Sequence, residues 1–179
     1  MAGLMSALGY EEFWVQGGDW GAGVGTWLTL KYPHRVTGLH LNYIPGSYLP
    51  FVNGDATDIE RAFLVQKDEW MTEAGGYGHI QRTRPLTLGY ALGDSPLGLA
   101  AWIFEKFVEW SDPTTRPSVD DILTNISIYW FTNTIASSVR LYLESVRTPL
   151  QFDQATRVEV PTGILRCCYE APFPPRSWG

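Results

Sequence analysis

The chain has 179 residues, which is the size of one ordinary domain. Hydrophobic residues make up 45% of it and aromatic residues 14%, a composition that favours a packed globule over a disordered chain. The net charge of −6 provides no basic surface for nucleic acid or acidic membranes, and the sequence has no apolar run of about 18 residues that would predict a bilayer span.

Residues 1–43 predict an α/β unit. A short helix is expected to stop near Gly9, a strand leads to Gln16, a helix covers about 22–32 and a second strand covers 36–41. A strand–helix–strand unit of this kind is typical of a parallel sheet that is covered on both faces.

The turn between the first strand and the second helix has the sequence Gln-Gly-Gly-Asp-Trp-Gly, residues 16–21. A strand, one tight turn and a helix form a nucleophile elbow, whose apex carries the reacting side chain. Gly17 and Gly21 lie two residues before and after Asp19, where a missing Cβ lets strand and helix approach closely. An aspartate at the apex predicts attack on carbon and an alkyl-ester intermediate, because a carboxylate needs no base to become a nucleophile. The alternative is a turn aspartate that caps the following helix.

The pattern changes from about residue 44. Chain breaks are expected at Pro45, Gly46, Pro50 and Gly54, and the segment that follows them, to about residue 149, is predicted to be helical. Helix starts are predicted at three capping sequences and one further site: Thr57 to Glu60, Ser95-Pro96, Ser118 to Asp121, and Thr134. The aromatic stripe Trp102, Phe107 and Trp110 is expected to pack in a core.

A strand is expected again over residues 158–165, so the helical stretch is interpreted as a lid inserted between two strands of one sheet. The predicted organisation is an α/β core segment at 1–43, the lid at 44–149 and the returning core at 150–179. Three parallel strands with the elbow at their centre would leave sheet edges unpaired, so we interpret the chain as the middle of a larger fold.

Cys167 and Cys168 are adjacent and cannot join distant segments, and we expect two buried thiols rather than a metal site. The N-terminus has neither the basic leader nor the long apolar core of a secretory signal. We therefore expect a cytoplasmic protein without a cofactor.

The chain resembles the epoxide hydrolases of the α/β-hydrolase fold, in particular the microsomal and juvenile-hormone types. The resemblance is carried by several segments in the family's order: Leu8 to Tyr10, Gln16 to Gly21, Gly38 to Asn42, Tyr77 to Gln81, Arg84-Pro85, Asp94 to Ala101, Glu105 to Phe107, Asp120 to Asn125, Tyr129-Trp130 and Val160 to Gly163. It implies a partial α/β-hydrolase fold with a helical cap, and a small apolar epoxide as substrate.

The resemblance implies a role for four residues, and the position of Trp20 at a helix N-terminus adds a fifth candidate. Asp19 is the expected nucleophile, and Tyr77 and Tyr142 match the two tyrosines that hold the epoxide oxygen. Glu170 matches the acid that orients the catalytic histidine, and the backbone N–H of Trp20 is expected to contribute one oxyanion contact.

Two parts of the family pattern are missing: an upstream His-Gly-x-Pro loop and a downstream Gly-Gly-His motif. His34, His40 and His79 do not match the catalytic histidine by position, and Cys167-Cys168 replaces the family's Phe-Pro. We therefore expect a truncated chain that is inactive in isolation.

Other interpretations stay open. A haloalkane dehalogenase would use the same aspartate, with the Trp20 indole N–H binding halide, although Trp20 could also be elbow packing. Tyr77 and Tyr142 could be packing residues, Glu170 a surface acid and His79 a hydrogen-bonded lid residue. A non-catalytic remnant that acts as a binding module is the third possibility, and the oligomeric state is open.

Overall fold

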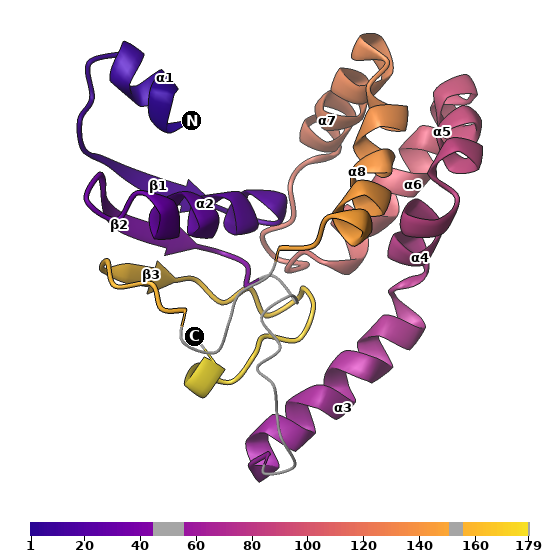
Figure 1. Ribbon diagram of the computed structural model, residues 1–179. Helices are drawn as coiled ribbons and strands as arrows, with labels where there is room; N and C mark the ends of the chain where they lie inside the picture. Colours follow the sequence, from indigo (N-terminus) through magenta and orange to yellow (C-terminus); the bar gives the residue numbers. More distant parts are fainter. Residues whose placement is uncertain (45–55, 151–155, 179) are drawn as a thin grey trace. The chain divides into compact units, whose positions relative to one another are not determined.

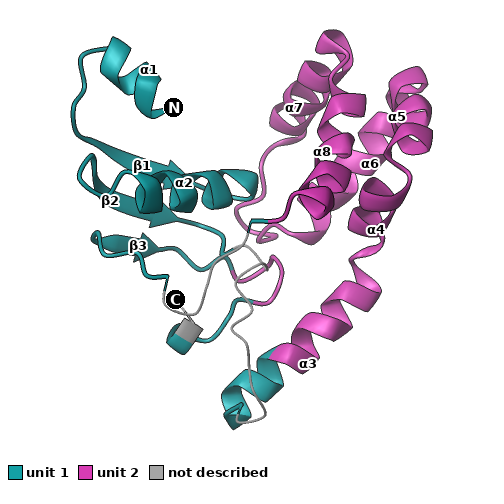
Figure 2. Ribbon diagram, viewed as in Figure 1, with its two compact units in different colours: residues 1–63, 150–167, 173–179 teal, residues 64–149, 168–172 magenta. Residues whose placement is uncertain are grey.

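The computed structural model describes residues 1–44, 56–150 and 156–178, and it divides into two compact units (Figure 1, Figure 2). Unit 1 comprises residues 1–63, 150–167 and 173–179, and unit 2 comprises residues 64–149 and 168–172. Each unit has its own hydrophobic core.

Unit 1 is built on a three-stranded parallel sheet with the order β1-β2-β3. Its elements are α1 (Ala2–Ala7), β1 (Phe13–Gly17), α2 (Trp20–Lys31), β2 (Val36–Leu41), β3 (Thr162–Ile164) and the 3-10 turn η2 (Arg176–Trp178). The parallel strand–helix–strand unit of β1, α2 and β2 confirms the α/β prediction, including the bounds of β2 (Figure 1).

Two details of the predicted sheet are wrong. The elbow strand β1 lies at an edge of the described sheet rather than at its centre, because only β2 pairs with strands on both sides. The third strand is also shorter than expected. The carbonyl of Pro161 accepts from the N–H of Leu39 at 3.0 Å, but proline has no N–H with which to continue the ladder toward residue 158.

The core of unit 1 lies between α2 and the sheet. Ala22 of α2 is fully buried against Leu39 and Leu41 of β2. The side chains of Thr26 and Thr29 are also buried, and each donates its hydroxyl to a carbonyl one turn earlier in α2, at 2.9 and 2.8 Å. Small residues on this face therefore bring the helix close to the sheet and leave no hydroxyl unsatisfied.

Helix α1 ends at the glycine that the sequence predicts as its stop. Gly9 has a φ of +85°, and its N–H donates to the Ser6 carbonyl at 3.0 Å, while the Tyr10 N–H donates to the Met5 carbonyl at 2.9 Å. These two bonds form the Schellman arrangement that closes a helix C-terminus.

Unit 2 is helical. Its helices are α3 (Asp58–Glu73), whose first turns belong to unit 1, followed by α4 (Gly76–Thr83), α5 (Pro85–Asp94), α6 (Pro96–Glu109), α7 (Val119–Thr132) and α8 (Ile135–Arg147). The predicted helix starts are confirmed, and Ser95 and Ser118 each cap their helix through the side chain. Thr134 precedes α8 without a side-chain cap.

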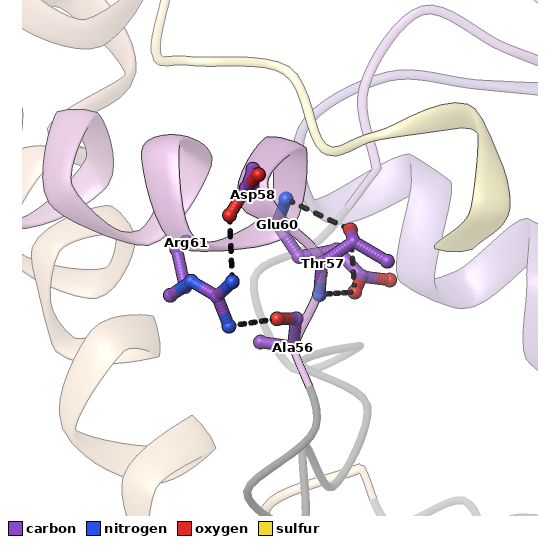
Figure 3. Close-up of polar contacts among 5 residues, drawn as sticks. All are labelled: Ala56, Thr57, Asp58, Glu60 and Arg61. Atoms are coloured by element: carbon purple, nitrogen blue, oxygen red, sulfur yellow. Dashed lines mark hydrogen bonds and ion pairs between the residues drawn. The ribbon is translucent and has the colours of Figure 1, made fainter.

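Helix α3 begins with the predicted capping box (Figure 3). The Thr57 N–H donates to Glu60 Oε2 at 2.8 Å, and the Glu60 N–H donates to Thr57 Oγ1 at 3.3 Å. Arg61 donates to Asp58 Oδ1 at 2.6 Å and also to the carbonyl of Ala56. The first turn of α3 is therefore stabilised by reciprocal side-chain bonds.

The core of unit 2 contains residues of four helices, namely Leu92, Leu99, Ile122, Ile126, Ile135 and Val139. Trp102 and Phe107 pack against it, as the sequence predicts. Trp110 differs, because its ring lies 6.0 Å from the ring of Trp70 and 5.2 Å from that of Tyr77, in a separate aromatic group.

The predicted chain breaks at Pro45, Gly46, Pro50 and Gly54 lie outside the described residues. The boundary between the units falls within α3, whereas the sequence predicts that the lid begins at residue 44, and the predicted domain limits stay a prediction. In the parts of the chain that the structure describes, no helix is long and apolar enough to cross a membrane.

Candidate active site

Asp19 lies at the apex of the turn between β1 and α2, with a φ of 46° and a ψ of −124°. The other non-glycine residue with positive φ in the described ranges is Asn133, which ends α7 in the ordinary left-handed conformation. The backbone of Asp19 lies outside that conformation. Such a residue typically costs about 1–3 kcal/mol and persists where the surroundings hold it in place. The geometry is that of the predicted nucleophile elbow.

The sequence predicts that Gly17 and Gly21 both leave room for the close approach of strand and helix, and this is correct only for Gly17. A Cβ on Gly17 would lie 2.2 Å from the backbone oxygen of Gly21, so the strand and the helix do approach too closely for a side chain. A Cβ on Gly21 would meet nothing within 4 Å outside the backbone of its own helix, so the expected crowding at Gly21 is wrong. The second crowded position is Gly18, where a Cβ would lie 2.2 Å from Oδ1 of Asn42.

Asn42 is a site residue that the sequence analysis missed. Its N–H donates to the Gly17 carbonyl at 3.3 Å, and its Oδ1 accepts from Nε2 of Gln16 at 3.4 Å. Asn42 follows directly after β2, and the carboxyl ends of neighbouring parallel strands meet at one edge of a sheet. A polar residue directly after a predicted strand was the available signal.

The carboxyl group of Asp19 is electrostatically unusual. Burial raises the pKa of Asp19 above its ordinary value, and a hydrogen bond from the Trp20 backbone N–H acts in the opposite direction. The residue as a whole stays accessible to solvent. Asp19 forms no side-chain N-cap bond with α2, so the alternative of a helix-capping aspartate is not supported. The backbone N–H of Trp20 donates to the Asp19 carboxyl group, and its role as an oxyanion contact stays a prediction.

Tyr77 of α4 and Tyr142 of α8 lie side by side in unit 2. Their ring centroids are 6.0 Å apart, and the planes meet edge to face at 79°. A Cβ on the buried Gly78 would lie 3.9 Å from the Tyr142 ring, so α8 packs closely on this part of α4. Two tyrosines that are distant in sequence are therefore neighbours within one unit, and both rings are half-buried.

The remaining predicted residues lie in different places. Glu170 is exposed, in a turn after β3, and by its contacts it belongs to unit 2. Since Asp19 belongs to unit 1, the assembly of Asp19, the tyrosines and Glu170 around one substrate stays a prediction. Cys167 is partly buried and Cys168 is exposed at the start of the turn, so the expectation of two buried thiols is wrong for Cys168.

Neither of the two histidines of unit 1 lies both at the Asp19 end of the strands and on the face of the sheet that α2 covers. His34 lies in the turn before β2, at the opposite end of the strands from Asp19. His40 lies between the buried Leu39 and Leu41 of β2 and therefore on the other face of the sheet, where a Cβ on Gly163 would lie 3.3 Å from its ring. His79 lies on α4 of unit 2.

A parallel sheet with a strained aspartate elbow between strand and helix is typical of the α/β-hydrolase fold. Residues 1–73 match the family model described as alpha/beta hydrolase fold. The chain is 37% identical to epoxide hydrolase 1 of Sus scrofa, over 98% of this chain and 44% of the relative. Nearly the whole chain is therefore similar to part of an epoxide hydrolase.

Solved structures show the same similarity. The juvenile hormone epoxide hydrolase of the silkworm Bombyx mori matches 98% of this chain and 47% of its own, with a TM-score of 0.77 and 33% identity. The epoxide hydrolase of Aspergillus niger matches 98% and 45%, with a TM-score of 0.79 and 28% identity. The chain therefore spans less than half the length of each of these three relatives.

Proposed function

We propose that this chain supplies the nucleophile and the proton-donating tyrosines of an epoxide hydrolase that converts small apolar epoxides to vicinal diols. The observation that carries the proposal is the conformation of Asp19, an aspartate held with positive φ at the apex of a strand–turn–helix elbow. This conformation presents the carboxylate at the carboxyl end of the sheet, where open α/β sheets bind their ligands.

In the first chemical step, a carboxylate oxygen of Asp19 forms a bond to a ring carbon, and the bond from that carbon to the epoxide oxygen breaks. The electron pair moves to the oxygen, which becomes an alkoxide. A phenol with a pKa of about 10 is a suitable hydrogen-bond donor and proton source for it, and Tyr77 and Tyr142 are two phenols at one place. The product of this step is an alkyl ester on Asp19.

In the second step, water attacks the ester carbonyl, the diol leaves and the carboxylate is restored. By resemblance to the family, a histidine paired with Glu170 activates this water, and the Trp20 N–H stabilises the oxyanion. The raised pKa of Asp19 fits a carboxylate that has lost part of its hydration and is more reactive when ionised.

The leaving group separates this proposal from the dehalogenase alternative. An epoxide oxygen needs a proton donor, whereas a halide ion needs N–H donors and no proton. The tyrosine pair therefore favours the epoxide, and the relatives described above are epoxide hydrolases.

The test uses two substrates with the same carbon skeleton, a terminal aryl epoxide and the corresponding chloroalkane. Each is incubated with the chain, and alkylated protein is measured by intact mass after quenching. We expect one adduct per chain with the epoxide, and at least about 100-fold slower reaction with the chloroalkane. Comparable alkylation by both substrates, or a faster reaction with the chloroalkane, would contradict the proposal.

A further inference from the structure

A lysine ammonium lies against the ring of Tyr77. Lys106 of α6 places its Nζ 5.3 Å from the Tyr77 ring centroid and 5.2 Å from the ring of Trp110. Trp110, the residue that ends α6, lies one helical turn after Lys106, and both side chains contact the ring of Tyr77 on α4. The cation is therefore held between two aromatic faces at the distance of a cation–π contact.

The charges around this ammonium are unevenly exposed. The Lys106 side chain is 19% exposed, while its two ion-pair partners, Glu105 and Glu109, are 57% and 48% exposed. Nζ lies 3.4 Å from Glu109 Oε2 and also contacts the carboxylate of Glu105. Water therefore screens the two carboxylates more than it screens the ammonium that lies over the rings.

The surroundings of Lys106 favour its ammonium form. Burial acts to lower the pKa of Lys106, but hydrogen bonds and charge interactions with Glu105 and Glu109 outweigh it, and the pKa lies above its ordinary value. The groups that contact the Tyr77 ring include this cation and the Trp110 ring, together with the Tyr142 ring of α8.

We propose that Lys106 is a positioning residue for Tyr77, which it holds by its ring face and makes the stronger proton donor of the tyrosine pair. A nearby cation stabilises a phenolate more than a neutral phenol, so it favours release of the phenol proton to a developing alkoxide. The catalytic meaning of this inference rests on the proposed function. The coupling between Lys106 and Tyr77 does not, because it can be measured without substrate.

The direct measurement is an NMR titration of the chain labelled with ¹³C at the tyrosine Cζ, with the Tyr77 signal assigned from Tyr77→Phe. Lys106→Met keeps the aliphatic stem and removes the charge, and we expect the pKa of Tyr77 to rise by about 0.5–1 pH unit. The pKa of Tyr142 should move less, since the cation lies over the ring of Tyr77. Lys106→Arg should restore the pKa of Tyr77.

Glu109→Gln is the matched control, because it removes a carboxylate and keeps the lysine. The pKa of Tyr77 should then fall, which is the opposite sign to Lys106→Met. A merely structural role of Lys106 would not produce opposite signs. If the pKa of Tyr77 is unchanged in Lys106→Met, or if Lys106→Arg behaves like Lys106→Met, the inference is overturned. Thermal unfolding confirms that each variant is folded.

Alkylation by a terminal epoxide separates the two proposals. Lys106→Met should slow it by about 3–10-fold, with the loss recovered in Lys106→Arg. If the pKa of Tyr77 moves as expected but no epoxide adduct forms in any variant, the coupling holds and the proposed function fails. If adducts form at the same rate in all variants and the pKa of Tyr77 does not move, the function holds and the role of Lys106 fails.

Discussion

Asp19 combines a φ of 46° with a carboxylate whose pKa is raised by burial. Both conditions lower the stability of the folded chain, and the hydrogen bond from the Trp20 N–H offsets only part of the effect of burial. Strained backbone and perturbed titration gather at functional sites, because chemistry needs a group in an arrangement that stability alone would not select. At the residue scale, Asp19 is therefore better explained by reactivity than by folding.

Asp19→Asn should stabilise the chain at neutral pH. A raised folded pKa means that the stability associated with protonated Asp19 is present below the unfolded pKa, about 3.9, and is lost as pH rises through the folded pKa. Asparagine removes this loss and can still accept from the Trp20 N–H. We expect the melting temperature to rise by about 1–3 °C at pH 7 and the difference to close at pH values near 3.5.

Asp112→Asn is the control of opposite sign. Hydrogen bonds from the Thr114 hydroxyl and backbone N–H lower the pKa of Asp112, so its carboxylate contributes stability above the unfolded pKa. This substitution should lower the melting temperature at pH 7. A lower melting temperature of Asp19→Asn at pH 7 would contradict our account of the Asp19 environment.

The tyrosine pair makes a separate prediction. Tyr77→Phe and Tyr142→Phe should each slow alkylation of Asp19 by about 10–1000-fold, the range for loss of a positioned acid or oxyanion donor. If both hydroxyls serve one oxygen, the double variant should lose less than the product of the two single losses. Quenched-flow intact mass measures the rates, and unchanged alkylation in Tyr142→Phe would refute the pairing.

At the scale of elements, the elbow depends on contacts of two glycines with backbone and with Asn42. Gly17→Ala places a Cβ 2.2 Å from the Gly21 carbonyl oxygen, and neither backbone can easily move. We expect a loss of about 2–3 kcal/mol in the free energy of unfolding. Gly21→Ala, in the first turn of α2, should be neutral or stabilising by about 0.5–1 kcal/mol. Chemical denaturation of both variants tests this, and equal losses would be inconsistent with the elbow geometry.

The elements that could be predicted from the sequence have strong local signals. Strand β2 is a short apolar run between turns, and α3, α6 and α7 begin at side-chain caps. The order of the strands could not be predicted, because pairing depends on segments far apart in the chain. The bounds of α4 and α5 were not predicted, and their segments were identified only by their match to the family. Helix α4 has neither a capping side chain nor an acidic first turn that would mark its start.

The residues of the candidate active site also divide into those with a local sequence signal and those that depend on contacts between distant segments. The aspartate elbow could be predicted because its turn is local, and the tyrosines were indicated by resemblance to the family. Lys106 could not be, because its role arises from a tertiary contact with Tyr77. Asn42 had only the signal of a polar residue directly after a predicted strand, and its contact with Gly18 is tertiary. A lysine between two glutamates reads in sequence as an ordinary exposed helix face.

At the scale of the whole molecule, Asp19 belongs to one unit, and the tyrosines and Glu170 belong to the other. The expected lid over the elbow, the cytoplasmic location and the inactivity of the isolated chain stay predictions. For the last of these, the two histidines of unit 1 offer no base on the face of the elbow: His34 lies at the far end of the strands, and His40 lies on the other face. Ester formation should therefore be faster than ester hydrolysis in these 179 residues.

Covalent trapping is the most direct test of the central claim that Asp19 is the nucleophile. The purified, monodisperse chain is incubated with an excess of a terminal aryl epoxide, its intact mass is measured, and the modified peptide is sequenced. We predict one persistent adduct, located on Asp19, and no adduct in Asp19→Asn. An adduct on another residue, or an equal yield in Asp19→Asn, would contradict the account.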